Sequence, residues 1–220
     1  YWRLAFDNVS KVHVITTDKH PNQGFSSLYH FYGVVNGSGA WSWFKSDGTA
    51  LGALPYGPAD ITRIYDGSTV RCWVSDAVLD GSGYPCVAWM KYPNNDGTLI
   101  EYWYSRQSAG GWAHTKVCDA GPALGGSGDT YHGGYCIDAN NVDRIYLSAP
   151  ISGVLQIQEW RTPDSGASWS QYRVITSGAG VKGRPISPRN HGTGLFEGGT
   201  GCWKEIRRIL LAIDPVAGLA

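Results

Sequence analysis

Three groups of polar side chains in this sequence have the types and spacing that chemistry requires. They are Asp18, His20, Tyr29 and His30; Tyr131, His132, Tyr135 and Asp138; and Arg184, Arg189 and His191. Arginine offers a planar fork to a carboxylate, and histidine and tyrosine can transfer protons. This combination indicates a site for an acidic ligand. We predict His20, His30, Tyr131 and His132 as catalytic, and the other residues, Asp138 apart, as ligand-binding.

Each of these residues also has a structural interpretation. A histidine in a strand-rich protein is often a hydrogen-bonded core residue, and Asp18 and Asp138 follow β-like segments where they could cap turns. Four tryptophans could stack on a ligand ring or fill the core, namely Trp41, Trp43, Trp89 and Trp103. The clustering of the histidines favours the functional interpretation.

The elements that must position these groups are short strands. The sequence predicts strands at 11–17, 28–35 and 70–83 and within YHGGYCIDANN at 131–141, among others, separated by turns rich in Gly, Pro, Asn and Asp. No convincing helix is found; residues 202–214 have some helical periodicity but could equally form a strand. The 30 glycines and 23 Trp and Tyr residues fit this all-β pattern.

Composition excludes several classes of protein. The 18 basic and 18 acidic residues give a formal net charge of zero, which gives a nucleic-acid partner little electrostatic support. No apolar run approaches the length of a bilayer span.

The five cysteines contain no CxxC pair, so a zinc site is not expected, and buried free thiols are favoured over disulfides. The only methionine is Met90, so we expect either a processed leader or a piece of a longer protein.

The strands fall into units of 40–50 residues, the repeat length of four-stranded propeller blades. The units span about 11–48, 70–118 and 132–176, and the remainder would supply one or two further blades. We therefore predict a single all-β domain over 1–220, a β-propeller of four or five blades or part of a larger one. A jelly roll or sandwich is the structural alternative.

The strongest local motif is the segment TPDSGASW at 162–169, which fits the Asp-box pattern Ser/Thr-x-Asp-x-Gly-x-x-Trp. Its physics is that of a hairpin turn. We expect Asp164 to accept backbone N–H bonds, Gly166 to supply an unusual backbone angle, and Trp169 to pack between sheets. A partial copy occurs at Ser46–Gly48. The motif is structural, so Asp164 receives no catalytic role.

Five blocks in order extend this motif: TTDKHPNQGFSSLYHFYG, WVSDAVLDGSGYPCVAW, YHGGYCIDANNVDRIYLS, IQEWRTPDSGASW and GRPISPRN. Together they resemble the bacterial-neuraminidase-repeat (BNR) proteins of the sialidase-like propeller group. The resemblance covers about residues 10–191 and implies a propeller that acts on carbohydrate, with ligands at the central channel or on one face. It also implies an extracellular or secreted protein. Further blades usually precede the first block in this family, so we expect a reduced propeller, a fragment, or half of a propeller completed by another chain.

Three functions remain open. A polysaccharide lyase would use His or Tyr to remove the proton α to a uronic carboxylate and Arg to neutralise that carboxylate. A glycoside hydrolase would need two carboxylates, for which Glu101 and Glu159 are candidates, although exposure at a strand edge is the alternative for both. No arginine triad of the sialidase kind is evident. The third function is a non-catalytic glycan-binding or structural module.

The expected partner is thus an acidic polysaccharide or glycan, with no nucleic acid and no membrane, and with a homo-oligomer as an option. No cofactor or metal site is predicted, although turns rich in Asp leave Ca²⁺ as an alternative.

Overall fold

The structure, a computed structural model, describes residues 1–187. Within this range the chain is all-β, and its one helical element is the short 3-10 turn η1, Pro21–Gln23. The strands are β1 (Trp2–Phe6), β2 (Lys11–Thr17), β3 (Leu28–Val35), β4 (Trp41–Lys45), β5 (Thr62–Tyr65), β6 (Arg71–Leu79), β7 (Pro85–Tyr92), β8 (Ile100–Ser108), β9 (Gly111–Gly121), β10 (Tyr135–Asp138), β11 (Asn141–Ile151), β12 (Val154–Arg161) and β13 (Ser170–Val174).

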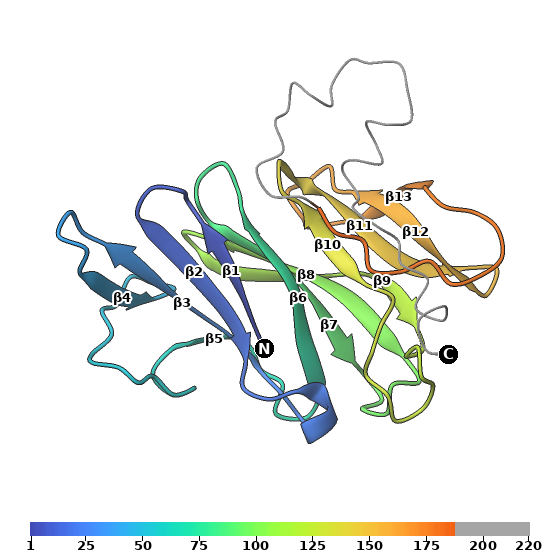
Figure 1. The fold of residues 1–220 in the computed structure, drawn as a ribbon, viewed down its shortest axis with the longest axis horizontal. Coiled ribbons are helices and arrows are strands. Elements are labelled where there is room, and N and C mark those ends of the chain that lie inside the picture. Colours follow the sequence, from blue (N-terminus) through green and yellow to red (C-terminus); the bar gives the residue numbers. More distant parts are fainter. Residues whose placement is uncertain (188–220) are drawn as a thin grey trace, which may run out of the picture.

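These strands form three separate antiparallel sheets (Figure 1). The orders are β1-β2-β3-β4, with β5 also paired to β3, then β6-β7-β8-β9, then β10-β11-β12-β13. Each sheet is a meander of four consecutive strands, which is the topology of a propeller blade. The three sheets overlap the three predicted repeat units, although the first sheet also includes β1 and β5, which lie outside the predicted unit 11–48.

The predicted strands at 11–17 and 28–35 match β2 and β3 residue for residue. Every strand pairing within residues 1–187 joins strands of the same sheet, including that of β5 with β3 in the first sheet. None of the three sheets closes on itself within residues 1–187. The fourth and fifth predicted blades would draw on the part beyond 187, which lies outside the described residues, as does the 202–214 segment.

The middle sheet is covered on both faces by the other two. Toward the first sheet, Ile15 and Leu28 pack against Val74 and Trp89, all of them buried. Toward the third sheet, buried side chains of β7 and β8 meet those of β10 and β11. Trp89 is fully buried and its indole N–H donates to Ser105 Oγ at 2.7 Å, so it has no face to offer a sugar ring.

The turn at 162–169 has the predicted construction. Asp164 Oδ1 accepts from the Ser168 backbone N–H at 2.8 Å and from the Thr162 hydroxyl at 2.7 Å. Gly166 has φ +96°, and a Cβ there would lie 2.5 Å from the Tyr104 ring, so only glycine fits. Trp169 packs edge-on against Tyr104 at a centroid distance of 5.0 Å. The motif therefore joins the third sheet to the second.

Cys72 and Cys86 are buried free thiols, as predicted, and Cys118 is a half-buried free thiol. Burial raises the pKa of all three to about 12, which keeps them protonated and unreactive. Cys202 lies outside the described residues.

Candidate functional site

The first strands of the three sheets lie next to one another, with β6 between β1 and β10. Hydrogen bonds link them in series. Arg3 Nε donates to the Ser75 carbonyl at 2.5 Å, and Ser75 Oγ donates to the Tyr135 carbonyl at 2.6 Å. The Ile137 backbone N–H donates to Asp76 Oδ2 at 3.0 Å. These links hold side chains from three sheets around one place.

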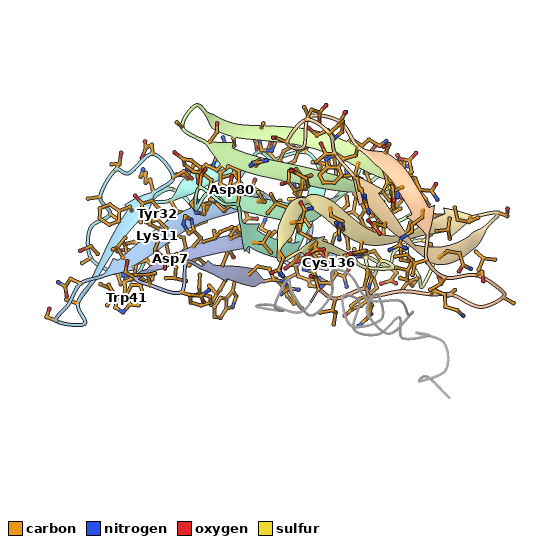
Figure 2. All side chains as sticks on the ribbon, turned by 90° about the horizontal axis from the view of Figure 1, so that it is seen from above. Asp7, Lys11, Tyr32, Trp41, Asp80 and Cys136 are labelled. Carbon is orange, nitrogen blue, oxygen red and sulfur yellow. The ribbon has the colours of Figure 1, made fainter. Side chains whose placement is uncertain are left out.

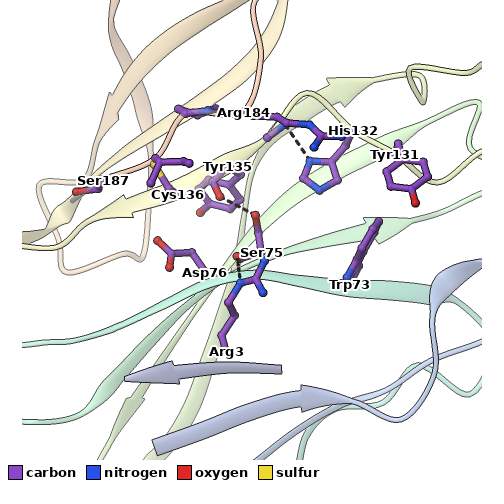
Figure 3. A pocket seen from close by; sticks show the side chains of 13 residues that line it. Arg3, Trp73, Ser75, Asp76, Tyr131, His132, Tyr135, Cys136, Arg184 and Ser187 are labelled. Carbon is purple, nitrogen blue, oxygen red and sulfur yellow. Dashed lines mark hydrogen bonds between the residues drawn. The ribbon is translucent and has the colours of Figure 1, made fainter. Parts of the chain in front are cut away.

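At that place the surface forms a pocket of about 590 Å³ (Figure 3). This volume lies in the usual range for small-ligand sites. The side chains that matter chemically come from all three sheets and from two loops: Arg3, Trp73, Asp76, Tyr131, His132, Tyr135 and Arg184.

His132 is held in one orientation by the backbone. The Gly134 N–H donates to its Nδ1 at 3.0 Å, and the opposite edge of the ring faces the pocket (Figure 3). Burial among protein atoms, with smaller contributions from Arg184 and Arg3, lowers the pKa of His132 to about 3. The ring is therefore neutral at neutral pH. Since Nδ1 accepts a bond, Nε2 carries the proton, and His132 offers the pocket a hydrogen-bond donor rather than a base.

His20 has the same arrangement on a neighbouring loop. The Asn22 N–H donates to His20 Nδ1 at 3.0 Å, which again leaves Nε2 as the donor. Burial lowers the pKa of His20. His20 and Asp18 line a second, shallower hollow. His20 and His132, which were predicted as proton-transfer groups, are therefore neutral and offer hydrogen-bond donors.

Trp73 joins the two hollows. Its ring lies edge-on to His20 at 4.8 Å, to Tyr131 at 5.8 Å and to His132 at 5.9 Å. The two loops that carry these residues are also tied together, because the Thr130 hydroxyl bonds to the Asn22 side chain. The result is a continuous aromatic wall from His20 to Tyr131.

The tyrosines of the site fall into two kinds. Tyr131 is 46% exposed, so its hydroxyl can meet a ligand. Tyr135 is buried against Tyr102, and burial holds the pKa of both phenols well above the ordinary value. Tyr131 is therefore the phenol of this pocket that is available for proton transfer.

Arg184 lies at the pocket because its backbone packs closely against the backbone of Gly133 and Gly134. Its N–H bonds to the Gly133 carbonyl, and a Cβ on Gly134 would lie 2.5 Å from Arg184 Cα. Arg184 itself has φ +56°, a conformation that residues other than glycine rarely adopt. Strain of this kind is typical of functional sites.

The pocket carries two guanidinium groups and one carboxylate. That carboxylate, Asp76, accepts the backbone N–H groups of Ala77 and Ile137. The pocket is thus net positive among the described residues, which favours an anionic ligand.

The predicted site residues are only partly brought together. Tyr131, His132, Tyr135 and Arg184 line the main pocket, and Asp18 and His20 the adjoining hollow. Asp138 is buried and within 3.5 Å of Arg144, away from the pocket lining. Arg189 and His191 lie outside the described residues.

His30 and Tyr29 do not join them. His30 is fully buried between the first two sheets, where its Nε2 meets His13 Nδ1 at 2.9 Å and its Nδ1 meets Ser46 Oγ at 2.7 Å. Tyr29 is 6% exposed and lines neither hollow. The even spacing of a strand sends Ile15 and His30 to the same covered face, because they are cross-strand partners. Neither His30 nor Tyr29 can therefore contact a ligand in this structure.

The two glutamates proposed for a two-carboxylate mechanism are also occupied. Glu101 is 9% exposed and pairs with Lys116 at 2.7 Å. Glu159 is fully buried and is paired with three guanidinium groups, those of Arg144, Arg161 and Arg173. The expectation of exposure at a strand edge was wrong for both, since each carboxylate is buried and is ion-paired with partly exposed basic side chains of its own sheet.

Sequence reasoning missed Arg3 and Trp73. Trp73 lies in a predicted strand, and its position between buried Cys72 and Val74 could have indicated that it faces the other side. Arg3 precedes the first predicted unit, so no pattern pointed to it.

Among residues 1–187, no group of three or more His, Cys, Asp or Glu side chains could hold a metal ion. Over the same range, the helical content includes no segment long and apolar enough to cross a membrane.

No protein-family model and no curated protein sequence matches the chain. Among solved structures, it is similar to a PL25 ulvan lyase bound to a GlcA(1-4)Rha3S saccharide, with a TM-score of 0.56 and 14% identity. The likeness covers 80% of this chain and 42% of the lyase, so the chain spans less than half of that protein. It shows a shared fold.

Two further structures are more distant. The ulvan lyase without the saccharide gives a TM-score of 0.47 at 14% identity, covering 78% of this chain and 44% of the lyase. The GH74 enzyme of Niastella koreensis gives 0.30 at 19% identity, covering 77% and 17%. Scores this low support no conclusion about the present chain.

Proposed function

We propose that this protein binds an acidic polysaccharide in the pocket between β1, β6 and β10 and cleaves it by β-elimination. The observation that carries the proposal is the donor set of the pocket. Arg3, Arg184 and the neutral His132 are all hydrogen-bond donors, and they surround one exposed phenol, that of Tyr131.

The donor set suits a uronic acid carboxylate. Arg184 can bind it through two parallel hydrogen bonds, and His132 Nε2–H can add a third. These bonds strengthen as negative charge develops on the carboxylate when the neighbouring C–H bond breaks. Trp73 supplies an apolar face for an adjoining sugar ring, and the hollow beside His20 lies on its other side.

The elimination then needs one proton-transfer group. The proton on C5 leaves to a base, the C4–O4 bond breaks, a C4=C5 double bond forms, and a proton is delivered to O4. We assign both transfers to Tyr131, since both histidines near Trp73 have their Nδ1 engaged and their Nε2 protonated. Tyr131 acts as the phenolate, which takes the C5 proton and becomes the phenol, and the phenol then delivers that proton to O4, so that the phenolate is restored. Hydrolysis is less well supported, because it needs a pair of carboxyl groups and the described lining of the pocket holds only Asp76.

The fold and family form part of the proposal. Three meander sheets in sequence, the turn at 162–169 and the ordered blocks support membership of the BNR group of sialidase-like propellers. The similar lyase is a carbohydrate enzyme whose bound saccharide contains GlcA, a uronic acid. These points agree with an acidic glycan as ligand.

The test is incubation with uronate-containing polysaccharides while the ultraviolet absorbance of the unsaturated uronyl product is followed. Arg184→Ala should lower kcat/KM by about 100-fold, equivalent to about 3 kcal/mol of transition-state stabilisation, and Arg184→Lys should retain part of the activity. Arg63→Ala is the matched control, because Arg63 is an exposed arginine on β5 outside the pocket.

If new reducing ends of the polysaccharide appear without ultraviolet absorbance, the cleavage is not an elimination, and the glycoside hydrolase becomes the supported function. Retardation in a glycan-containing gel without turnover would leave a binding module, the alternative that the net positive pocket also allows. An Arg184→Ala variant as active as the Arg63→Ala variant would show that the site lies elsewhere.

A further inference from the structure

The loop at 122–134 connects β9 of the second sheet to β10 of the third, and it carries Tyr131 and His132 to the pocket. Figure 2 shows the first and third sheets at opposite ends of the molecule, with the second sheet between them. His20 belongs to the connection between β2 and β3 of the first sheet. The rings around Trp73 thus come from loops of different sheets, and their relative position depends on what ties those loops together.

The base of the loop at 122–134 is fixed to the second sheet by backbone contacts. The Ala123 N–H donates to the Gly97 carbonyl at 2.8 Å, and the Gly128 N–H donates to the Asp96 carbonyl at 2.6 Å. Gly97 has φ +75°, and a Cβ there would collide with the Asp129 carbonyl. The loop is therefore packed tightly on the turn between β7 and β8.

Thr130 is the buried residue that directly precedes the exposed Tyr131. Thr130 is fully buried, whereas Tyr131 is 46% exposed. The Tyr92 hydroxyl donates to the Thr130 carbonyl at 2.6 Å, and burial raises the pKa of Tyr92, so this hydroxyl stays protonated as a donor. Because the two residues share a peptide bond, a shift of Thr130 also moves Tyr131.

The side chain of Thr130 reaches across to the first sheet. Its hydroxyl donates to the side-chain oxygen of Asn22, and among residues 1–187 this is the one hydrogen bond between the loop at 122–134 and the first sheet with its connections. Asn22 also orients His20, because its backbone N–H donates to His20 Nδ1 at 3.0 Å. Asn22 thus links the position of His20 to that of Tyr131, and Trp73 lies edge-on to both rings.

We infer that Thr130 is a positioning residue for Tyr131, and that its bond to Asn22 sets where the Tyr131 phenol lies relative to a sugar bound against Trp73. The inference rests on the proposed function, in which Tyr131 transfers the proton. Thr130 is not part of the lining of the pocket or of the hollow beside it, so it acts through Tyr131 rather than by contact with the ligand. A displacement of about 1 Å in a reacting group can cost about 100-fold in rate.

Thr130→Val removes the hydroxyl and keeps the branched shape of the side chain. We expect kcat for the elimination to fall by at least about tenfold and KM to change by less than about twofold, because the groups that bind the carboxylate are untouched. Thr130→Ser keeps the hydroxyl and should retain most of the activity. Asn22→Ala should lower kcat to a similar extent, and a variant with both Thr130→Val and Asn22→Ala should be no slower, since each change removes the same bond.

Thr176→Val is the matched control. The Thr176 hydroxyl donates to the side-chain oxygen of Gln156 at 2.8 Å, outside the pocket, so this variant loses the same kind of bond and should keep the wild-type kcat. Urea denaturation checks that each variant folds. A Thr130→Val protein with the kcat of the wild type, or a Thr130→Ser protein as slow as Thr130→Val, overturns the inference.

Fluorine NMR of the chain labelled with 3-fluorotyrosine gives a measure that needs no turnover, and Tyr131→Phe identifies the Tyr131 signal. The Tyr131 ring lies edge-on to Trp73 at 5.8 Å (Figure 3), so the ring current of the indole makes this signal sensitive to the position of Tyr131. We expect the signal to shift in Thr130→Val and in Asn22→Ala, and to stay in place in Thr130→Ser and in Thr176→Val.

The two measurements separate the inference from the proposed function. A wild type that yields no unsaturated product refutes the elimination, and the Tyr131 signal then decides the positioning role on its own. A signal that Thr130→Val leaves unmoved overturns the positioning role, whether or not the wild type is active.

Discussion

Replacing His30 by alanine should unfold this protein more readily without touching the pocket. His30 is fully buried, and its two ring nitrogens are bonded to His13 and Ser46. Its removal leaves His13 with no partner on either ring nitrogen, because His13 Nε2 already lacks one. An unpaired buried polar group costs about 1–3 kcal/mol. The cavity beside Trp112 adds about 2–3 kcal/mol.

Together these costs amount to about 4 kcal/mol, a large share of the 5–15 kcal/mol that typically stabilises a domain. Urea denaturation followed by tryptophan fluorescence measures the loss as a lower midpoint. The control is His20→Ala, which removes a half-buried ring with one bond to the Asn22 backbone and should cost about 1 kcal/mol or less. A His30→Ala protein of wild-type stability that has lost activity would refute this reasoning and restore His30 as a catalytic residue.

Two further predictions concern the buried histidine pair and the approach of the two backbones. Burial lowers the pKa of His13 to about 4 from an unfolded value near 6.5, so the unfolded chain takes up the proton first. This contribution to the stability is fully present above pH 6.5 and falls by about 3 kcal/mol as the pH drops towards 4, and urea midpoints across this range measure the fall. His13→Gln should remove this part of the fall, whereas the parts contributed by His30 and His132, whose pKa values burial also lowers, should remain. Gly134→Ala should displace the Arg184 backbone, because the new Cβ would collide with it and because Gly134 has a φ of +104°, which alanine rarely adopts. We expect the free energy of unfolding in urea to fall by about 1–3 kcal/mol and glycan binding to weaken. An unchanged affinity for the glycan would contradict this prediction.

The strands were predictable because their signals are local. Alternating runs such as Lys11–Thr17, bounded by turn residues, specify a strand without knowledge of its partners. The turn at 162–169 was predictable for the same reason, since its bonds join residues within eight positions of one another. The repeat length then grouped the strands into the three sheets that the structure contains.

The membership of the site was less predictable because it depends on which face of each sheet is covered. His20 and His30 are close in sequence and look equivalent there. One follows a strand in a loop and reaches the surface, whereas the other lies inside β3 beneath the middle sheet. Trp73 was missed for the converse reason, since a tryptophan in a strand resembles core until the neighbouring loops are placed around it.

The charged residues of this chain show why its chemistry is better matched to binding an anion than to carboxylate catalysis. Only 16% of its residues are charged, and many of the acidic ones have structural partners. Glu159 is held by three arginines, Glu101 by Lys116, and Asp80 by Arg106. A carboxylate bound in this way is costly to release for acid–base work, because breaking a buried pair leaves an uncompensated charge. Under the proposed function, Arg3 and Arg184 are the charges that the pocket directs at its anionic ligand.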